Sequence, residues 1–559
     1  MKGKRIFLAL TSLITAVALT PLWGGCRKAA PNDENTLEIY ATSAGFGIEW
    51  IKKLIPVFEE QHEGATVYFG ENSYDVGVEL CRDKVEGGPS VNTADLLISL
   101  EDWQTLVMQG KNGVSGYDYA LEDLTDLLDE EVDGEPLRDK FLPYTLDVCA
   151  MEVETEDGVY EKREFFIPWA TSYSGILYNK TLFAEHPDWE LPRTTDELLG
   201  LCDKIKGQGI IPFVNETTTG YIDYMAQCVF AQYLGIDEYY DYYNPITEED
   251  GYKYAADSEE SKARLYAMFV MDDLLNPDNG RLSGTAQEDD YGRAQGRLIS
   301  GEGAMAVMGD WFDNEMSITI EQAHAAGNDY ESGMMPVPVI SALSEKLSYW
   351  DTVMSSEKDY AYFYNNRGTE GANLAVCDEL LAKIVDYVDN GEEGELPSVQ
   401  LSGRTITATE GDVDIVREAR RCYSSLGSGH TLVIPSYASA KELAKEFVKL
   451  LFSETGIQIF LETTSGGSLP VKYDVTRWSG YENASGFQKQ VYALSQSGTP
   501  VQHPSSLTWQ ISGLPDPSNK KFYQYGKNEA GYISPQEYLT RDSLTQAEYI
   551  ALMQLANLL

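Results

Sequence analysis

Few residues in this sequence are spaced for catalysis. The five histidines form no His-Glu-x-x-His zinc motif, and the chain contains no Gly-x-Ser-x-Gly nucleophile motif and no Walker A phosphate loop. Gly45-Phe46-Gly47 begins like a dinucleotide-binding loop, but Trp50 stands where that motif needs its third glycine. Carboxylates are abundant, and no pair stands out as the acid and base of a glycosidase. We therefore predict that the protein is not an enzyme and uses no cofactor.

Metal ligands are equally sparse. Asp129, Glu131, Asp133 and Gly134 follow the spacing of the first half of a calcium loop, but Lys140 occupies the position of the bidentate glutamate. We interpret this acidic run as a solvated surface turn. Six of the seven cysteines are scattered along the chain without a Cys-x-x-Cys pair. We predict no metal site and no redox motif, and we assign no disulfide.

Charge excludes one class of partner. The formal charge is −47 at pH 7, so nucleic acid and anionic lipid repel the chain, and no basic patch relieves this repulsion. We therefore exclude nucleic-acid binding. The 36 tyrosines and 9 tryptophans are many for so polar a chain, and most of them are explained as residues that line the edges of the hydrophobic core. This aromatic content still favours a carbohydrate ligand. A small anion is disfavoured because the sequence has no positively charged cluster that could bind phosphate or sulfate.

The N-terminus has the layout of a secretory signal. Three basic residues precede an apolar stretch over residues 6–19, and small residues follow it. This stretch is short for a membrane span, which needs about 20 residues. We predict a signal peptide over residues 1–25.

Cys26 is a candidate for lipidation. Gly24 and Gly25 precede it as in a bacterial lipobox, although Trp23 stands where that motif usually has leucine. Several acyl chains on Cys26 would hold the protein at a membrane, whereas one chain binds only marginally. Residues 26–36 would then form a lipidated tether, and membrane contact would occur through this anchor only.

The elements that would position a site alternate between strand and helix. Strands are predicted over residues 37–41, 65–69 and 94–100, with helices over 48–61 and 76–85 between them. This β-α-β-α-β order predicts a mostly parallel sheet covered on both faces. Ligands bind such sheets at the carboxyl ends of the strands.

Two further helices have predicted N-terminal caps, and a long stretch separates them. Thr194 with Glu197 and Ser439 with Glu442 have the spacing of capping boxes. Residues 341–428 resemble an insert, which holds aromatic-rich runs and a predicted helix over residues 374–388.

Several short motifs occur in a characteristic order. They lie at residues 175–180, 191–198, 209–213, 301–311, 335–338, 439–447 and 465–470. In these motifs the sequence resembles the family of ABC-transporter sugar-binding lipoproteins related to maltose-binding protein, known as extracellular solute-binding protein family 1. The resemblance covers about residues 37–340 and 430–475.

The resemblance implies an α/β, two-lobed periplasmic-binding-protein-like fold, with a ligand cleft between the lobes and crossing hinge segments. By this analogy, lobe 1 comprises residues 37–168 plus 333–460, including the insert. Lobe 2 comprises residues 169–332 plus 461–559, including a C-terminal helical tail. Hinge closure would trap a sugar or oligosaccharide, and the closed form would dock on ABC permease subunits. The protein would act as a monomer on the outer face of the bacterial cytoplasmic membrane.

The resemblance also implies ligand-binding residues. Trp311 corresponds to a tryptophan that commonly stacks on a sugar ring, where an aromatic face covers the C–H face of a pyranose. Its alternative role is core packing behind a strand. Asp310 would accept hydrogen bonds from sugar hydroxyls, or would simply be a turn residue.

Five other residues complete the candidate set. Trp169 and Tyr173, at the entrance to the second lobe, would be cleft wall or hinge packing. Gly45 and Phe46 lie in the first strand-to-helix loop, where backbone N–H groups can approach a ligand. The alternative is that these residues form a simple turn. Gly467, within Ser-Gly-Gly, is a further candidate.

Two other functional classes remain open at this point. A surface carbohydrate-active hydrolase would need two carboxylates facing one cleft at catalytic separation. A ligand sensor would keep the same fold but contact a membrane kinase instead of a permease.

Overall fold

The protein is described here by a computed structural model that covers residues 33–502 with internal gaps. The predicted signal peptide, Cys26 and the C-terminal helical tail lie outside the described residues, as does most of the helix predicted over residues 76–85. The gaps are residues 44, 74–80, 82–83, 101–102, 104–118, 144, 148, 157–158, 217–220, 244–252, 254, 256, 287, 426–429 and 465.

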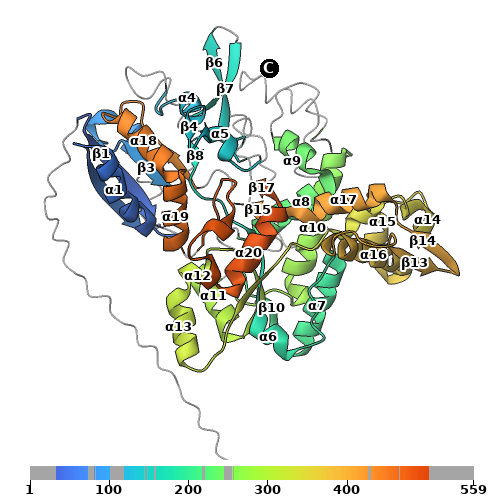
Figure 1. Ribbon diagram of the computed structural model, residues 1–559. Helices are drawn as coiled ribbons and strands as arrows, with labels where there is room; N and C mark the ends of the chain where they lie inside the picture. The colour runs from blue at the N-terminus through green and yellow to red at the C-terminus, as the bar shows by residue number, and fades with distance from the viewer. Residues whose placement is uncertain are drawn as a thin grey trace, which may run out of the picture.

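The first sheet combines two distant parts of the chain. Its strands, in the order β2–β1–β3–β16–β8, are β1 (Thr36–Ser43), β2 (Thr66–Ser73), β3 (Leu96–Ser99), β8 (Ile167–Pro168) and β16 (Thr431–Val433). β1 pairs in parallel with β2 and β3, which confirms the parallel pairing predicted from the sequence. Helix α1 (Glu49–Gln61) buries Trp50, Leu54 and Phe58, and it packs against α18 (Lys441–Leu451) and α19 (Glu454–Thr463) (Figure 1).

The second sheet is larger and mixed. Its strands, in the order β10–β11–β9–β15–β17, are β9 (Ser174–Asn179), β10 (Ile211–Phe213), β11 (Gly303–Gly309), β15 (Cys422–Ser425) and β17 (Thr499–Gln502), and β12 (Ser332–Met335) also pairs with β9. All residues of β9 and β11 are buried, as expected for strands covered on both faces. The longer helices of this unit are α7 (Thr195–Gly207), α8 (Tyr221–Leu234), α10 (Glu259–Leu275), α11 (Tyr291–Ser300) and α20 (Gly486–Ser497).

Two of the segments through which the chain crosses between the sheets lie against each other. The first runs from β8 to β9 through Trp169 and Tyr173, and the second runs back from β15 to β16. The backbone N–H of Trp169 donates to the carbonyl of His430 at 2.9 Å, and the hydroxyls of Thr171 and Ser425 also hydrogen-bond. Paired crossings of this kind form the hinge of a two-lobed fold.

The insert packs on the second sheet's helices. It contains η4 (Ser341–Lys346), α14 (Trp350–Met354), α15 (Tyr360–Asn365), α16 (Arg367–Asp389), the hairpin β13–β14 (Ser398–Leu401, Arg404–Thr407) and α17 (Glu410–Arg421). Leu380 and Val416 share one hydrophobic cluster with Leu198 and Val229, and α17 contacts α8. The prediction grouped residues 341–428 with lobe 1, whereas these contacts attach them to the second sheet. Figure 1 shows α17 beside α8 of this unit.

The remaining elements are short. The acidic run suspected of resembling a calcium loop forms the turn of hairpin β4–β5, where the Lys140 ammonium pairs with Asp133 at 2.7 Å. None of the helices in the described ranges combines the length and apolar character that crossing a bilayer requires. These elements are α4 (Thr125–Leu128), β4 (Glu131–Val132), β5 (Glu135–Pro136), α5 (Leu137–Lys140), β6 (Ala150–Glu156), β7 (Val159–Glu164), α6 (Lys180–Glu185), α9 (Ile236–Tyr243), α12 (Phe312–Glu315) and α13 (Ser317–Ala325), with 3₁₀ turns at Gly88–Ser90, Pro277–Asn279, Val475–Arg477 and Tyr481–Asn483.

Candidate ligand-binding site

The loop after β1 touches the loop after β11. The rings of Phe46 and Trp311 meet edge to face with centroids 6.4 Å apart. The Asn314 amide donates a hydrogen bond of 2.7 Å to the Gly45 carbonyl. These loops follow the carboxyl ends of strands from different sheets, so two predicted parts of the site come together at the position where α/β folds bind ligands.

The loop of residues 466–468, after α19, contacts Tyr492, Phe46 and Asp310. The Tyr492 hydroxyl lies against Gly466, where an added Cβ would be 2.2 Å from the oxygen. Gly467 lies against Phe46, and a Cβ there would be 2.6 Å from the ring. The Ser468 hydroxyl donates to Asp310 Oδ2 at 2.5 Å. Glycine at 466 and 467 therefore allows close approach, which gives the Ser-Gly-Gly motif a steric explanation.

Asp310 is placed by its backbone and by this loop. Its N–H donates to the Tyr173 carbonyl at 3.1 Å, which continues the pairing of β11 with β9. Burial raises the pKa of the Asp310 carboxyl to about 7, although the hydrogen bond from Ser468 acts in the opposite direction. Oδ1 is buried and has no hydrogen-bond partner among the described residues. A buried oxygen without a partner is costly in a folded protein.

Trp311 is surrounded by aromatic rings. Tyr221 and Tyr224 of α8 lie 6.2 and 6.3 Å from its ring, and Phe46 covers a third side. Only 6% of Trp311 is exposed. In this structure the loop carrying Phe46 closes over the indole, which belongs to a hydrophobic core cluster, and a sugar ring could stack on it only after that loop had moved away.

The two residues at the hinge have different surroundings. Trp169 stacks on Trp50 at 5.3 Å, and its indole N–H donates to the Ser99 carbonyl at 3.2 Å. These contacts are hinge packing against the first sheet, so of the two alternatives for Trp169 the structure favours packing over cleft wall. Tyr173 stacks on Tyr423 at 4.6 Å, between the two crossing segments.

Sequence reasoning missed several residues that now surround the candidate set. Ser468 lies one residue beyond Gly467 in a motif that was recognised, so its spacing could have identified it. Tyr492 lies in a tail without any motif, and only the packing of α20 on β12 brings it to the site. Tyr221, Tyr224 and Asn314 carry no sequence signal that separates them from core aromatics and helix residues.

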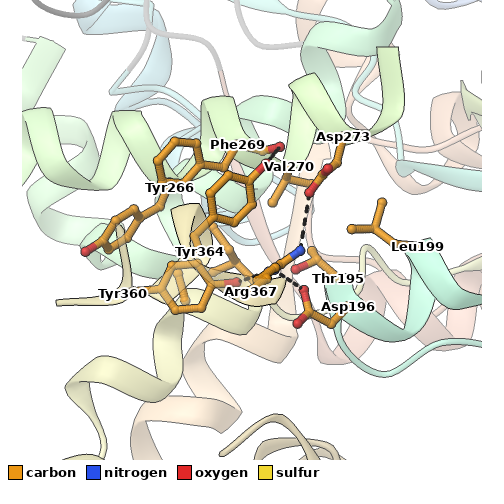
Figure 2. Close-up of a pocket in the computed structure, with 12 residues that line it drawn as sticks. Thr195, Asp196, Leu199, Tyr266, Phe269, Val270, Asp273, Tyr360, Tyr364 and Arg367 are labelled. Atoms are coloured by element: carbon orange, nitrogen blue, oxygen red, sulfur yellow. Dashed lines mark hydrogen bonds and ion pairs between the residues drawn. The ribbon is translucent and has the colours of Figure 1, made fainter. Parts of the chain in front are cut away.

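A small pocket also lies between α7, α10 and the insert (Figure 2). None of the predicted ligand-binding residues lines it. The Arg367 guanidinium bonds Asp196 at 2.7 Å and the Tyr360 hydroxyl at 2.9 Å, and it lies 4.5 Å over the Tyr364 ring. It also pairs with Asp273 at 3.5 Å. The Arg367 guanidinium therefore already pairs with the acidic residues that could attract a cationic ligand. These ion pairs anchor the insert to α7 and α10.

The fold and this site together define a two-lobed solute-binding protein. Residues 47–359 match the family of bacterial extracellular solute-binding proteins, and this chain belongs to that family. No curated protein sequence matches the chain.

Solved structures share the fold at low sequence identity. The GacH receptor of Streptomyces glaucescens, described without ligand and with acarbose, is 16% identical over 93% of this chain and 98% of its own, with a TM-score of 0.52. RafE from Streptococcus pneumoniae is 14% identical over 93% of this chain and 98% of its own, with a TM-score of 0.51. A protein described in work on xylan utilization by Caldanaerobius polysaccharolyticus is 14% identical over 91% of this chain and 99% of its own, with a TM-score of 0.53. These likenesses establish the fold.

Proposed function

We propose that this protein is the extracytoplasmic solute-binding subunit of an ABC importer, and that its cargo is a sugar or oligosaccharide. The observation that carries the proposal is the meeting of Phe46, Trp311 and Asp310 at the carboxyl ends of strands from both sheets. The combination of aromatic faces and a hydroxyl acceptor suits carbohydrate. The acarbose complexes of the similarly folded GacH receptor support the same cargo class.

Binding would follow an opening and closing cycle. In the open form the loop carrying Gly45 and Phe46 separates from Trp311, and a sugar ring enters between them. The Trp311 face then covers the apolar side of the ring, while Asp310 accepts a hydrogen bond from a hydroxyl. Closure encloses the solute, and the closed form is delivered to the permease.

The N-terminal sequence supports the cellular setting. Cleavage before Cys26 and lipidation of its thiol would hold the mature chain, as a monomer, on the outer face of the cytoplasmic membrane. We assign residues 37–168 and 429–460 to the first lobe, and residues 169–428 with the C-terminal region to the second. We assign the insert to the second lobe, and no longer to the first, because it packs on α8.

A thermal-shift screen of residues 27–559 against mono- and oligosaccharides tests this function. A sugar at a hundredfold excess over its Kd should stabilise the native state by about 2.7 kcal/mol. Trp311→Leu should abolish the shift. Trp189→Leu is the matched control, because Trp189 is a buried tryptophan that packs on Phe183 and His186 away from the site.

The outcomes separate clearly. A sugar-induced shift that survives in Trp189→Leu and disappears in Trp311→Leu supports the cargo and the stacking residue together. A shift that persists in both variants would exclude Trp311 as the stacking residue. No shift with any sugar would reject carbohydrate as the cargo.

A further inference from the structure

Two buried polar atoms near the 466–468 loop have no hydrogen-bond partner within the described part of the chain. One is Oδ1 of Asp310 and the other is the hydroxyl oxygen of Tyr492. Tyr492 is only 4% exposed. Native proteins satisfy the great majority of buried polar groups, so such atoms at one site call for a functional explanation.

The backbone holds both groups at the same loop. Tyr492 belongs to α20, which is fixed to the second sheet because the Gln490 side chain accepts the Met334 N–H at 3.0 Å. Its hydroxyl lies against Gly466. Two residues later, Ser468 bonds the other carboxylate oxygen of Asp310 and leaves Oδ1 unused.

The two groups complement each other chemically. They do not hydrogen-bond to each other, yet they are close enough that the Asp310 charge adds to burial in raising the pKa of the Tyr492 phenol well above its ordinary value. Tyr492 therefore remains a neutral hydrogen-bond donor at physiological pH. Above its pKa of about 7 the Asp310 carboxyl is ionised, and a carboxylate is an acceptor only.

We propose that Tyr492 and Asp310 form a donor–acceptor pair that recognises one hydroxyl group of an uncharged polyhydroxylated solute. The solute hydroxyl accepts a hydrogen bond from Tyr492 and donates one to Oδ1 of Asp310. A carbonyl could only accept and an ammonium could only donate, while a phosphate or carboxylate would meet a buried negative charge. This inference rests on the proposed function, and it adds Tyr492 as a specificity residue.

The test compares two tyrosine-to-phenylalanine variants of the mature chain. The Tyr492 hydroxyl has no hydrogen-bond partner among the residues that the structure describes, so Tyr492→Phe should leave the ligand-free melting midpoint unchanged or raise it. The same variant should weaken the best sugar found in the screen about tenfold, measured by titration calorimetry.

Tyr473→Phe is the matched control and should behave in the opposite way. The Tyr473 hydroxyl donates to Glu454 at 2.9 Å and accepts from Gln458 at 2.6 Å, so its loss should lower the midpoint and leave sugar affinity unchanged. Deoxy derivatives of that sugar, each lacking one hydroxyl, then identify the recognised group. One derivative should bind weakly to the parent protein and lose no further affinity in Tyr492→Phe.

Each alternative outcome has a distinct meaning. If a sugar binds the parent and Tyr492→Phe equally well, the inference is wrong and the proposed function stands. If Tyr492→Phe destabilises the ligand-free protein as much as Tyr473→Phe does, the hydroxyl has a structural role and the inference is again wrong. If no sugar binds but a phosphorylated polyol does, the inference and the carbohydrate function both fail.

Discussion

At the scale of single residues, burial of the Asp310 carboxyl lowers the stability of the folded protein, and the same carboxyl is proposed to bind the solute. Its carboxyl is buried with one oxygen unused, and burial raises its pKa to about 7. An unfolded aspartate has a pKa near 3.9. Between about pH 4 and pH 7 the native state therefore binds the proton that the unfolded state releases, and stability falls as pH rises through this window. Above pH 7 the full cost of a buried charge is present.

We predict that Asp310→Asn stabilises the ligand-free protein at high pH. The variant keeps the shape of the side chain and removes the titration. The excess of its unfolding free energy over that of the parent should grow by roughly 2–3 kcal/mol between pH 5 and pH 8. Urea unfolding of both proteins from pH 5 to pH 8 measures the difference.

The comparison must be made between variant and parent at each pH. Burial lowers the pKa of His430 to about 3, so that residue makes stability rise as pH increases from about 3 to 6.5 and partly offsets Asp310. Both proteins share His430, so its contribution cancels in the difference. A constant difference across the range would mean that Asp310 is already ionised at pH 5.

At the scale of elements, Arg367 attaches the insert to the second sheet. Its guanidinium, at the first position of α16, contacts Asp196 of α7 and Asp273 of α10 (Figure 2). Burial raises the pKa of the Asp273 carboxyl, while the charge of Arg367 lowers it. Removal of the cation would leave two partly buried carboxylates without compensation, which costs more than the loss of an exposed ion pair.

We predict that Arg367→Met lowers the unfolding free energy by roughly 2–3 kcal/mol at pH 7. Lys383→Met in the same helix is the control, because its pair with Glu379 is largely exposed and should contribute less than about 0.5 kcal/mol. Urea unfolding followed by circular dichroism gives both values. Equal effects of the two substitutions would show that Arg367 does not anchor the insert.

Elements with local signals could be predicted from the sequence. The strand expected over residues 37–41 lies within β1, and the helix expected over 374–388 lies within α16. Half of the capping box expected at the start of α7 forms, because the Thr194 hydroxyl accepts the Glu197 N–H, whereas the Glu197 carboxylate accepts the N–H of Arg193. The capping box predicted at Ser439 is wrong, because the Ser439 hydroxyl bonds Asp95 and Ala440 is the N-cap. A distant carboxylate decides that helix end, and local spacing carries no information about it.

The residues of the candidate site also fall into two groups, those that the sequence identifies and those that only the packing of distant segments reveals. Trp311 and Gly467 belong to motifs with family-wide spacing, so the sequence could identify them. Tyr492 and the docking of the insert depend on packing between segments more than 100 residues apart, such as the contact of α20 with β12 and the contact of α17 with α8. Such pairings follow from complementary surfaces, which no single stretch of sequence encodes.

At the scale of the whole molecule, the closed arrangement limits access to the site. One hydrophobic cluster contains Ile39 and Trp50 of the first unit together with Ala306 and Trp311 of the second. The hydrogen bond from Asn314 to Gly45 adds a polar contact between the same loops. Because a solute must enter an open form and be held by the closed form, its affinity depends on how strongly these contacts favour closure.

We predict that Asn314→Ala shifts the ligand-free protein toward the open form. Loss of one hydrogen bond of about 1 kcal/mol would raise the open-to-closed ratio about fivefold and weaken a solute that requires closure by up to the same factor. Small-angle X-ray scattering should report a larger radius of gyration for the ligand-free variant, and saturating sugar should restore the parent value. Asn328→Ala is the control, because its amide bonds the Ile299 carbonyl within the second unit. Weaker binding with unchanged ligand-free scattering would mean that Asn314 contacts the solute directly and that other contacts hold the cleft closed.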